Sequence, residues 1–153
     1  MTPATQLLKK HQASFTVLSY EHDASSTSFG LEAVEKLALP ATQVFKTLVL
    51  ETNTQQLIVA ITPVTQQVNL KLLAKACGAK KVHMAAAQKV ENSTGYVLGG
   101  VSPLGQKKRL ATYLHNSAQQ FDTIYVSAGK RGLEIALAPS VLLNLTSGHY
   151  ADF

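Results

Sequence analysis

Two apolar runs joined by a short polar connection constrain the fold more than any other feature of the chain. Residues 44–51 read VFKTLVLE, residues 57–62 read LIVAIT, and the connection contains the turn-like stretch TNTQ. Runs rich in β-branched and large apolar residues favour strands, and two of them this close together predict a β-hairpin. We therefore expect a fold that contains an antiparallel pair of strands.

Short helices and further strands are predicted on both sides of this hairpin. Thr2 followed by Pro3 is typical of a helix start, and Asn69 and Gly78 are residue types that begin and end helices. Because a regular βαβ alternation is missing, the pattern predicts an α+β fold on an antiparallel or mixed sheet rather than a Rossmann fold. Helices are expected over residues 4–11, 29–39, 70–76 and 139–145, with a shorter one before residue 93. Strands are expected over 15–20, 122–127 and 133–138, and the last two form a second predicted hairpin with a basic turn.

The chain is expected to form one domain over residues 1–153. This length is enough for one compact core, and no linker rich in Pro, Gly or Ser and no internal repeat divides it. No apolar run reaches the roughly 18 residues of a membrane-spanning helix, and the polar, basic N-terminal segment does not resemble a signal peptide. We therefore expect a cytoplasmic protein that does not contact a membrane.

Several enzyme classes lack their characteristic motifs in this sequence. The single cysteine, Cys77, leaves no disulfide framework and no thiolate zinc site, and the five histidines never fall at HxxxH or HExxH spacing. No GxGxxG follows a predicted strand, residues 100–107 lack the Gly-Lys-Ser/Thr of a P-loop, and GxSxG is absent. The sequence thus predicts no metal or other cofactor, and a serine triad would depend on the fold to bring Ser and His together.

Lys46 is the most informative residue of the predicted hairpin. Side chains on a strand alternate in direction, so Lys46 shares a face with Val44, Leu48 and Leu50. A lysine buried there needs a partner or loses its proton. Two interpretations stay open at this point. Lys46 is either an edge or snorkelling lysine that discourages aggregation, or a fixed cation that holds an anionic or carbonyl group of a ligand.

A glycine-rich segment followed by basic residues is the second candidate for function. Gly99 and Gly100 would allow backbone N–H groups to approach a ligand, as in an oxyanion hole, although a plain glycine turn has the same composition. The net charge of +5 permits a polyanionic partner. Basic residues that would either contact a phosphate backbone or form solvated faces fall in three clusters: Lys80 and Lys81; Lys107, Lys108 and Arg109; and Lys130 and Arg131.

Seven segments of the chain resemble, in order, the YbaK-type proteins. The most specific is STGYVLGGVSPLGQKKRL at residues 93–110, and the others are TPATQLLKK, YEHD, SFG, VFKTLVL, TPV and IYVSAGKRGLEI. That family is related to the editing insertion domain of bacterial prolyl-tRNA synthetases, and its YbaK branch hydrolyses Cys-tRNA(Pro) in trans. The resemblance implies a mixed, partly closed β-barrel flanked by short helices, within the α+β class.

The resemblance also implies which residues form the site. The essential lysine of the family matches Lys46, and its glycine-x-x-proline loop matches residues 100–103. Glu134 stands where the family usually has aspartate, and Ala128 where glycine is common. With the glycine and basic segments added, the expected substrate-binding residues are Tyr20, Phe29, Thr47, Gly99, Gly100, Pro103, Ser127 and Glu134, and the expected tRNA contacts are Lys107, Lys108, Arg109, Lys130 and Arg131.

We therefore expect a trans-editing hydrolase for mischarged Cys-tRNA(Pro), with prolyl-tRNA synthetase as a transient partner and no DNA. A site shaped for proline discriminates against similar amino acids by only about 1–3 kcal/mol, so a second hydrolytic site is one remedy. Lys46 and the Gly100 loop would orient the labile ester while the substrate's own thiol or ribose hydroxyl attacks. The alternatives are a deacylase for Ala-tRNA(Pro) or another small aminoacyl-tRNA, and a non-catalytic tRNA- or synthetase-binding module.

Overall fold

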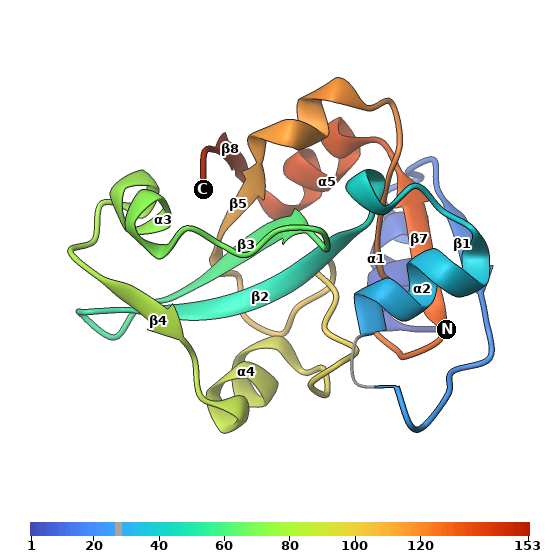
Figure 1. The fold of residues 1–153 in the computed structure, drawn as a ribbon, viewed down its shortest axis with the longest axis horizontal. Helices are drawn as coiled ribbons and strands as arrows, with labels where there is room; N and C mark the ends of the chain where they lie inside the picture. Colours follow the sequence, from blue (N-terminus) through green and yellow to red (C-terminus); the bar gives the residue numbers. More distant parts are fainter. Residues whose placement is uncertain (27–28) are drawn as a thin grey trace.

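The computed structural model describes residues 1–26 and 29–153, apart from the side chain of Phe29. Its helices are α1 (Pro3–Lys10), α2 (Phe29–Leu37), α3 (Leu70–Cys77), α4 (Ala87–Thr94) and α5 (Pro139–Thr146), with short 3-10 helices η1 (Ala41–Gln43) and η2 (Asn116–Gln120). The strands are β1 (Thr16–Ser19), β2 (Phe45–Thr52), β3 (Leu57–Pro63), β4 (Val82–Met84), β5 (Ala111–His115), β6 (Ile124–Ser127), β7 (Leu133–Leu137) and β8 (His149–Ala151) (Figure 1).

The described strands form two sheets. A five-stranded mixed sheet has the order β4-β2-β3-β5-β8, and a three-stranded antiparallel sheet has the order β1-β7-β6. The predicted hairpin is the β2–β3 pair, whose register runs from Phe45 opposite Pro63 to Glu51 opposite Leu57. Because β5 lies parallel to β3 and β8 parallel to β5, the larger sheet is mixed, which is one of the two arrangements expected.

Helix boundaries follow from the capping residues in the sequence. The Thr2 side chain accepts from the Thr5 N–H while the Thr5 side chain accepts from the Thr2 N–H, a reciprocal capping box at the start of α1. Asn69 Oδ1 accepts from the Leu72 N–H at 3.1 Å, and Gly78 ends α3 in the left-handed conformation. The predicted helices are therefore present, and none of the helices in residues 1–26 and 29–153 combines the length and apolar character needed to cross a membrane.

Three short strands were not predicted from the sequence. β4 and β8 have three residues each, which is too short for an alternating pattern to be recognised. β5 pairs with β3 in parallel, with Ile58 opposite Ala111. This pairing joins segments that are distant in the sequence, so local residue preferences do not reveal it.

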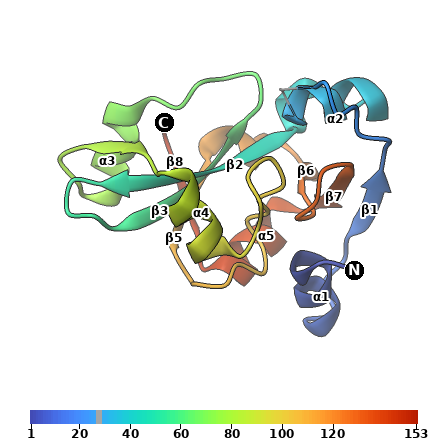
Figure 2. The same ribbon diagram turned by 90° about the horizontal axis from the view of Figure 1, so that it is seen from below.

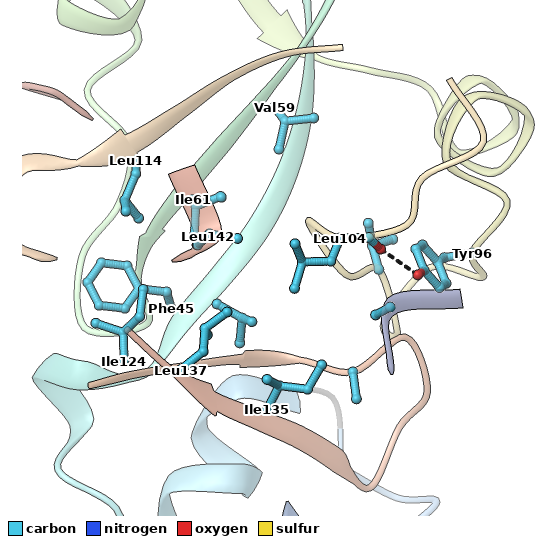
Figure 3. Close-up of a cluster of buried hydrophobic side chains, with 14 of the residues drawn as sticks. Phe45, Val59, Ile61, Tyr96, Leu104, Leu114, Ile124, Ile135, Leu137 and Leu142 are labelled. Carbon is cyan, nitrogen blue, oxygen red and sulfur yellow. Dashed lines mark hydrogen bonds between the residues drawn. The ribbon is translucent and has the colours of Figure 1, made fainter. Parts of the chain in front are cut away.

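The main hydrophobic core lies between the β2–β3 hairpin and the smaller sheet (Figure 3). Its buried side chains come from five strands, from α1, α4, α5 and η2, and from the loop after α4, among them Phe45, Ile61, Leu114, Ile124, Ile135 and Leu142. A second cluster, which includes Leu50 and Leu73, joins the other face of the mixed sheet to α3. Alternation along β2 thus sends Phe45 and Val49 to the main core and Leu48 and Leu50 to the second cluster.

The two sheets meet at the start of β2. Val44 forms a parallel bridge with Tyr125, and Gln43 Nε2 donates to the Thr123 carbonyl at 2.9 Å. Figures 1 and 2 show the smaller sheet at one end of the molecule with α1 and α2, and α3 and β4 at the other end. Strand pairing among the described residues therefore gives two sheets that touch at a bridge, and the partly closed barrel stays a prediction.

Candidate functional site

A pocket of about 470 Å³ lies where β2 passes between β4 and β6. β4 pairs with the end of β2, Leu50–Thr52, whereas the bridge to β6 is at Val44. The edge of β2 between these points has no neighbouring strand in the described part of the chain. The residues that line the pocket are Tyr20, Gly30, Leu31, Phe45, Lys46, Thr47, Leu48, Val49, Val64, Met84, Ala85, Val90, Leu98, Gly99, Val101, Ser127, Lys130, Arg131, Leu133 and Glu134.

The main chain of Thr47 is turned toward this open edge. At the hairpin turn, the Thr52 N–H donates to the Gln56 carbonyl at 2.8 Å, so Thr52 and every second residue before it bond toward β3. Successive residues of an antiparallel strand bond to opposite neighbours, which directs the N–H and C=O of Thr47 away from β3. On the same edge the Val49 carbonyl accepts from the Ala85 N–H at 3.1 Å. The pocket wall therefore offers main-chain groups of Thr47 as well as side chains.

Lys46 lines the pocket from β2 and is partly exposed. Leu48 and Leu50, on the same strand face, pack against the second hydrophobic cluster, and Lys46 lies beyond the end of that cluster. No hydrogen bond or ion pair joins the Lys46 ammonium to another residue within the described ranges. The geometry agrees with a cation that is kept for a ligand rather than for an internal ion pair.

Glu134 is the only acidic side chain among the described residues that line the pocket. It lies on β7, between Leu18 of β1 and Ser127 of β6, and is 6% exposed. Burial raises the pKa of its carboxyl group to about 8. Burial, together with the negative charge of Glu134, also raises the pKa of Tyr20. The described residues contain no group of three or more His, Cys, Asp or Glu side chains that could hold a metal ion.

Two polar atoms on the pocket residues lack partners. Within the described part of the chain, Glu134 Oε2 and Thr47 Oγ1 are buried without a hydrogen bond. The nearby Ser127 hydroxyl, by contrast, accepts from the Gly129 N–H at 3.1 Å. Buried polar atoms in folded proteins are normally hydrogen-bonded. Two unsatisfied atoms on residues of one pocket therefore indicate a site that a polar ligand completes.

The glycine-rich loop forms one wall of the pocket, but Gly100 itself does not line it. Gly99, with φ +88°, lines the pocket, whereas the Gly100 N–H donates to the Val97 carbonyl at 2.9 Å. A Cβ atom on Gly100 would lie 3.3 Å from Lys130 Cα. The Gly100 N–H is thus engaged within the loop, and the expected role of Gly100 in substrate binding stays a prediction. Gly100 allows the loop to pack closely against the β6–β7 turn.

Four further residues of the predicted site lie outside the larger pocket: Pro103, Lys107, Lys108 and Arg109. Pro103, Lys108 and Arg109 line a second pocket of about 160 Å³, and Lys107 lines neither pocket. The Arg109 guanidinium donates to Ser147 Oγ at 2.9 Å, just after the end of α5. These residues therefore do not join Lys46 and Glu134 in the larger pocket.

The basic turn between β6 and β7 is part of the larger pocket. Lys130 and Arg131 line it, and the Arg131 guanidinium donates to the Leu98 carbonyl at 3.1 Å, which ties this turn to the glycine-rich loop. Phe29 lies in α2, and its side chain is outside the described part of the structure. The larger pocket thus gathers Tyr20, Lys46, Thr47, Gly99, Lys130, Arg131, Ser127 and Glu134 from the predicted set.

The apolar residues of the pocket were missed by sequence reasoning. Leu31, Met84 and Leu98 are 49%, 53% and 43% exposed and all line the pocket. Exposed apolar side chains around a cavity favour contact with a ligand. They belong to α2, β4 and the loop after α4, so no sequence spacing could have grouped them.

Comparison with known proteins connects this pocket to a family. The sequence model for the aminoacyl-tRNA editing domain matches residues 25–145, a range that contains most of the residues that line the pocket. The chain belongs to the aminoacyl-tRNA editing domain family. The family resemblance predicted from the sequence is thereby confirmed.

Relatives of this editing domain cover nearly all of the chain. A protein of Enterococcus faecalis, provisionally named Cys-tRNA(Pro)/Cys-tRNA(Cys) deacylase EbsC, is 43% identical over 152 residues, which are 99% of this chain and 92% of the relative. An uncharacterised protein of Bacillus subtilis, YwhH, is 26% identical over 139 residues, or 88% of each chain. Membership of the family and the deacylase relative confirm the prediction of an aminoacyl-tRNA deacylase.

Solved structures support the fold of the editing domain. A structure described provisionally as a trans-editing enzyme for prolyl tRNA synthetase superimposes with a TM-score of 0.84 at 21% identity, over 98% of this chain and 93% of that one. The hypothetical protein APE2540 gives a TM-score of 0.87 at 21% identity, over 98% and 97%. The mixed α+β architecture of two sheets with flanking helices is therefore that of known editing-domain structures.

Proposed function

We propose that this editing domain hydrolyses mischarged Cys-tRNA(Pro) in trans. The observation that carries the proposal is the Lys46 ammonium, which lines the larger pocket without a partner among the described residues. An ammonium held on a sheet strand is suited to bind a carbonyl or phosphate oxygen in a fixed position. The name of the Enterococcus relative supports cysteine as the aminoacyl group and tRNA(Pro) as its carrier.

The size of the pocket supports a small aminoacyl group together with part of the terminal nucleoside. Its volume of about 470 Å³ lies in the usual range for small-molecule sites, roughly 300–1,000 Å³. The rest of the tRNA would lie outside, where the exposed Lys130 stands at the pocket wall. Lys107, Lys108 and Arg109 would contact the RNA at a greater distance from the ester.

The reaction that we propose uses the substrate's own thiol. Lys46 binds the ester carbonyl oxygen and stabilises the negative charge that develops there. The thiol sulfur attacks the carbonyl carbon, a C–S bond forms, the C–O bond to the ribose breaks, and the thiol proton passes to the departing ribose oxygen. Water then opens the cyclic thioester and releases cysteine. In the alternative mechanism, the neighbouring ribose hydroxyl assists attack by water and no thiol is needed.

We also propose the extent of the domain, its location in the cell and its partner protein. We infer that residues 1–153 act as one editing domain in the cytoplasm, and that the contact of the two sheets at Val44 and Tyr125 represents a partly closed barrel. A domain of this size has little surface with which to read tRNA(Pro). Transient association with prolyl-tRNA synthetase would therefore supply the proximity to that tRNA.

Hydrolysis of three substrates tests this function. Release of amino acid from Cys-, Ala- and Ser-tRNA(Pro) is measured for the wild type, for Lys46→Ala and for the control Lys75→Ala, which changes an exposed lysine of α3. We expect rapid hydrolysis of Cys-tRNA(Pro), poor hydrolysis of the other two, and a loss of about 100-fold or more in kcat/KM for Lys46→Ala alone.

Three other results would change the mechanism, the substrate or the function that we propose. Comparable turnover of all three substrates would exclude the thiol mechanism, because alanine and serine have no thiol. A preference for Ala-tRNA(Pro) would make alanine the substrate. No turnover of any substrate would leave a non-catalytic binding module.

A further inference from the structure

Among the described residues, two buried acidic side chains have ion-pair partners and a third has none. Three glutamates are buried among the described residues: Glu32, Glu51 and Glu134. Glu32 accepts from His22 Nδ1 at 2.6 Å, and Glu51 pairs with Lys89 Nζ at 2.5 Å. Glu134 forms no ion pair within the described ranges, and its Oε2 atom is buried without a hydrogen bond. The unpaired acid is the one that lines the pocket.

The position of Glu134 makes its carboxyl group part of a rigid wall. β7 is the central strand of its sheet, with Leu18 of β1 on one side and Ser127 of β6 on the other. A side chain held on a central strand changes position little when a ligand binds. Leaving a buried polar atom unsatisfied is unfavourable for folding. A group that persists in this state at a pocket wall is therefore expected to find its partner in the ligand.

The charges around the pocket define the chemistry of that partner. Lys46 on β2, and Lys130 and Arg131 on the β6–β7 turn, supply positive charge, while Glu134 supplies the only carboxyl group among the described residues of the wall. Tyr20 is the remaining titratable side chain among the described residues of the wall. No ion pair joins Glu134 to Lys46 in the described part of the chain, so both groups stay available. The pocket therefore suits a ligand that carries both a cationic group and negatively polarised oxygen atoms. A cation bound beside Glu134 would favour its ionised carboxylate over the protonated form that burial alone favours.

We propose that Glu134 binds the α-ammonium group of the aminoacyl ester and so makes a free amino group a condition for entry. This inference rests on the proposed function, because an aminoacyl ester carries its ammonium group next to the carbonyl that Lys46 would bind. An N-acylated amino acid has a neutral amide in that place and cannot form the ion pair. The chain would consequently spare peptidyl-tRNA and other N-acylated aminoacyl-tRNAs.

A cycle of two proteins and two substrates tests the proposal. Deacylation of Cys-tRNA(Pro) and N-acetyl-Cys-tRNA(Pro) is measured for the wild type and for Glu134→Gln, which keeps the size of the side chain and removes its charge. We expect the wild type to prefer the free amino group, and Glu134→Gln to lower kcat/KM for Cys-tRNA(Pro) by about 10-fold or more while N-acetyl-Cys-tRNA(Pro) changes less than about threefold. Glu134→Asp should keep the preference, because the charge remains.

Binding of a stable analogue separates this proposal from the proposed function. Calorimetry gives the affinity of the wild type and Glu134→Gln for 3′-cysteinylamido-3′-deoxyadenosine and for its N-acetyl form, neither of which is hydrolysed. Weaker binding of the free-amine analogue to Glu134→Gln, with the N-acetyl analogue unaffected, would support the ammonium site. Equal losses for both analogues, or equal affinities in the wild type, would overturn it. Absence of deacylation by the wild type would contradict only the proposed function.

Discussion

The buried acid of the pocket differs from the other buried acids of the described residues in what the fold leaves unsatisfied. Glu51 is held by Lys89 and His83, and its pKa is lowered, chiefly by the hydrogen bond from Lys89. Glu134 has no such partner among the described residues, and burial alone raises its pKa to about 8. Buried acids in this chain therefore either stabilise neighbouring elements or face a pocket.

The pH dependence of stability follows from the raised pKa of Glu134. Between its usual pKa of 4.5 and about 8, the folded protein retains a proton that the unfolded chain has released, so the free energy of unfolding falls as the pH rises. The glutamine of Glu134→Gln does not titrate, so the free energy of unfolding of this variant does not fall with pH for this reason. We expect it to match the wild type near about pH 4 and to exceed it by roughly 2–4 kcal/mol above about pH 8, measured by urea unfolding. If the free energies of unfolding of the two proteins differed by a constant amount over this range, the pKa of the Glu134 carboxyl group would not be shifted.

The hydroxyl group of Thr47 offers a comparison with a second buried threonine. Thr47 Oγ1 and Thr62 Oγ1 are both buried without a hydrogen bond within the described ranges, but Thr47 lines the larger pocket and Thr62 does not. Replacement of either by valine should change the free energy of unfolding by less than about 1 kcal/mol, because no hydrogen bond is lost. We expect Thr47→Val to lower kcat/KM about 10-fold and Thr62→Val to leave it nearly unchanged. Equal effects of the two substitutions on kcat/KM would remove Thr47 from the site.

The resemblance to YbaK-type proteins supplied most of the polar part of the site, and the apolar part was not predicted. Lys46 is conspicuous in the sequence itself because a charge interrupts an apolar strand face, whereas Glu134 was expected only from the resemblance. Met84 and Leu98 have ordinary apolar side chains, and only the fold brings them to one cavity. The unpaired state of Glu134 also depends on its three-dimensional surroundings and could not be predicted.

Among the structural elements, the open edge of β2 and the glycine-rich loop create the pocket. β4 ends its pairing at Leu50, so Thr47 faces a space that the loop and the β6–β7 turn then enclose. The loop itself is fixed by the Tyr96 hydroxyl, which donates to the Leu104 carbonyl at 2.6 Å (Figure 3). Close packing at Gly100 completes the wall, because only a glycine fits against Lys130 without displacement.

Gly100→Ala tests the packing between the loop and the turn. The added Cβ would lie 3.3 Å from the main chain at Lys130, which is closer than most such contacts, so the two segments must move apart. We expect a loss of about 1 kcal/mol in the free energy of unfolding and a fall of about 10-fold in kcat/KM, since Gly99 and Lys130 both line the pocket. Thermal unfolding and deacylation rates measure the two effects. Wild-type kcat/KM in the variant would show that the spacing of these segments does not matter.

Local patterns predicted the hairpins and helices, because capping residues and apolar runs act over a few neighbouring positions. Asn69 and Gly78 mark the ends of α3 in the sequence as they do in the structure. The parallel contacts of β5 with β3 and β8 involve residues far apart in the chain, and they were not predicted. The edge of β2 is open because β4 pairs only with Leu50–Thr52 and the bridge to β6 lies at Val44. These contacts also join distant segments, so the pocket could not be located from sequence alone.

On the scale of the whole molecule, positive charge is spread over several places rather than gathered at the pocket. Lys130 stands at the pocket wall, Lys108 and Arg109 line the smaller pocket, and Lys81 lies at the start of β4. With a net charge of +5, general attraction to RNA is expected from all of them. Of the three basic clusters, only that of Lys130 and Arg131 lines the larger pocket within the described residues, and we expect Lys130 to contact the RNA next to the ester.

Salt dependence distinguishes this contact from general attraction. If Lys130 pairs with one phosphate of the single-stranded tRNA end, Lys130→Ala should lower the slope of log kcat/KM against log salt concentration by about 0.7. Lys81→Ala, which removes the same charge beside the distant β2–β3 turn, should leave the slope nearly unchanged. Equal slopes for both variants would mean that Lys130 contributes no specific phosphate contact.

The deacylation rate of Cys-tRNA(Pro) under single-turnover conditions tests the central claim most directly. If the pocket orients the ester through Lys46, the wild type should release cysteine far faster than the uncatalysed reaction, and Lys46→Ala should be slower by about 100-fold or more while it keeps its fold. Wild-type hydrolysis no faster than the uncatalysed rate, or Lys46→Ala as fast as the wild type, would contradict the account.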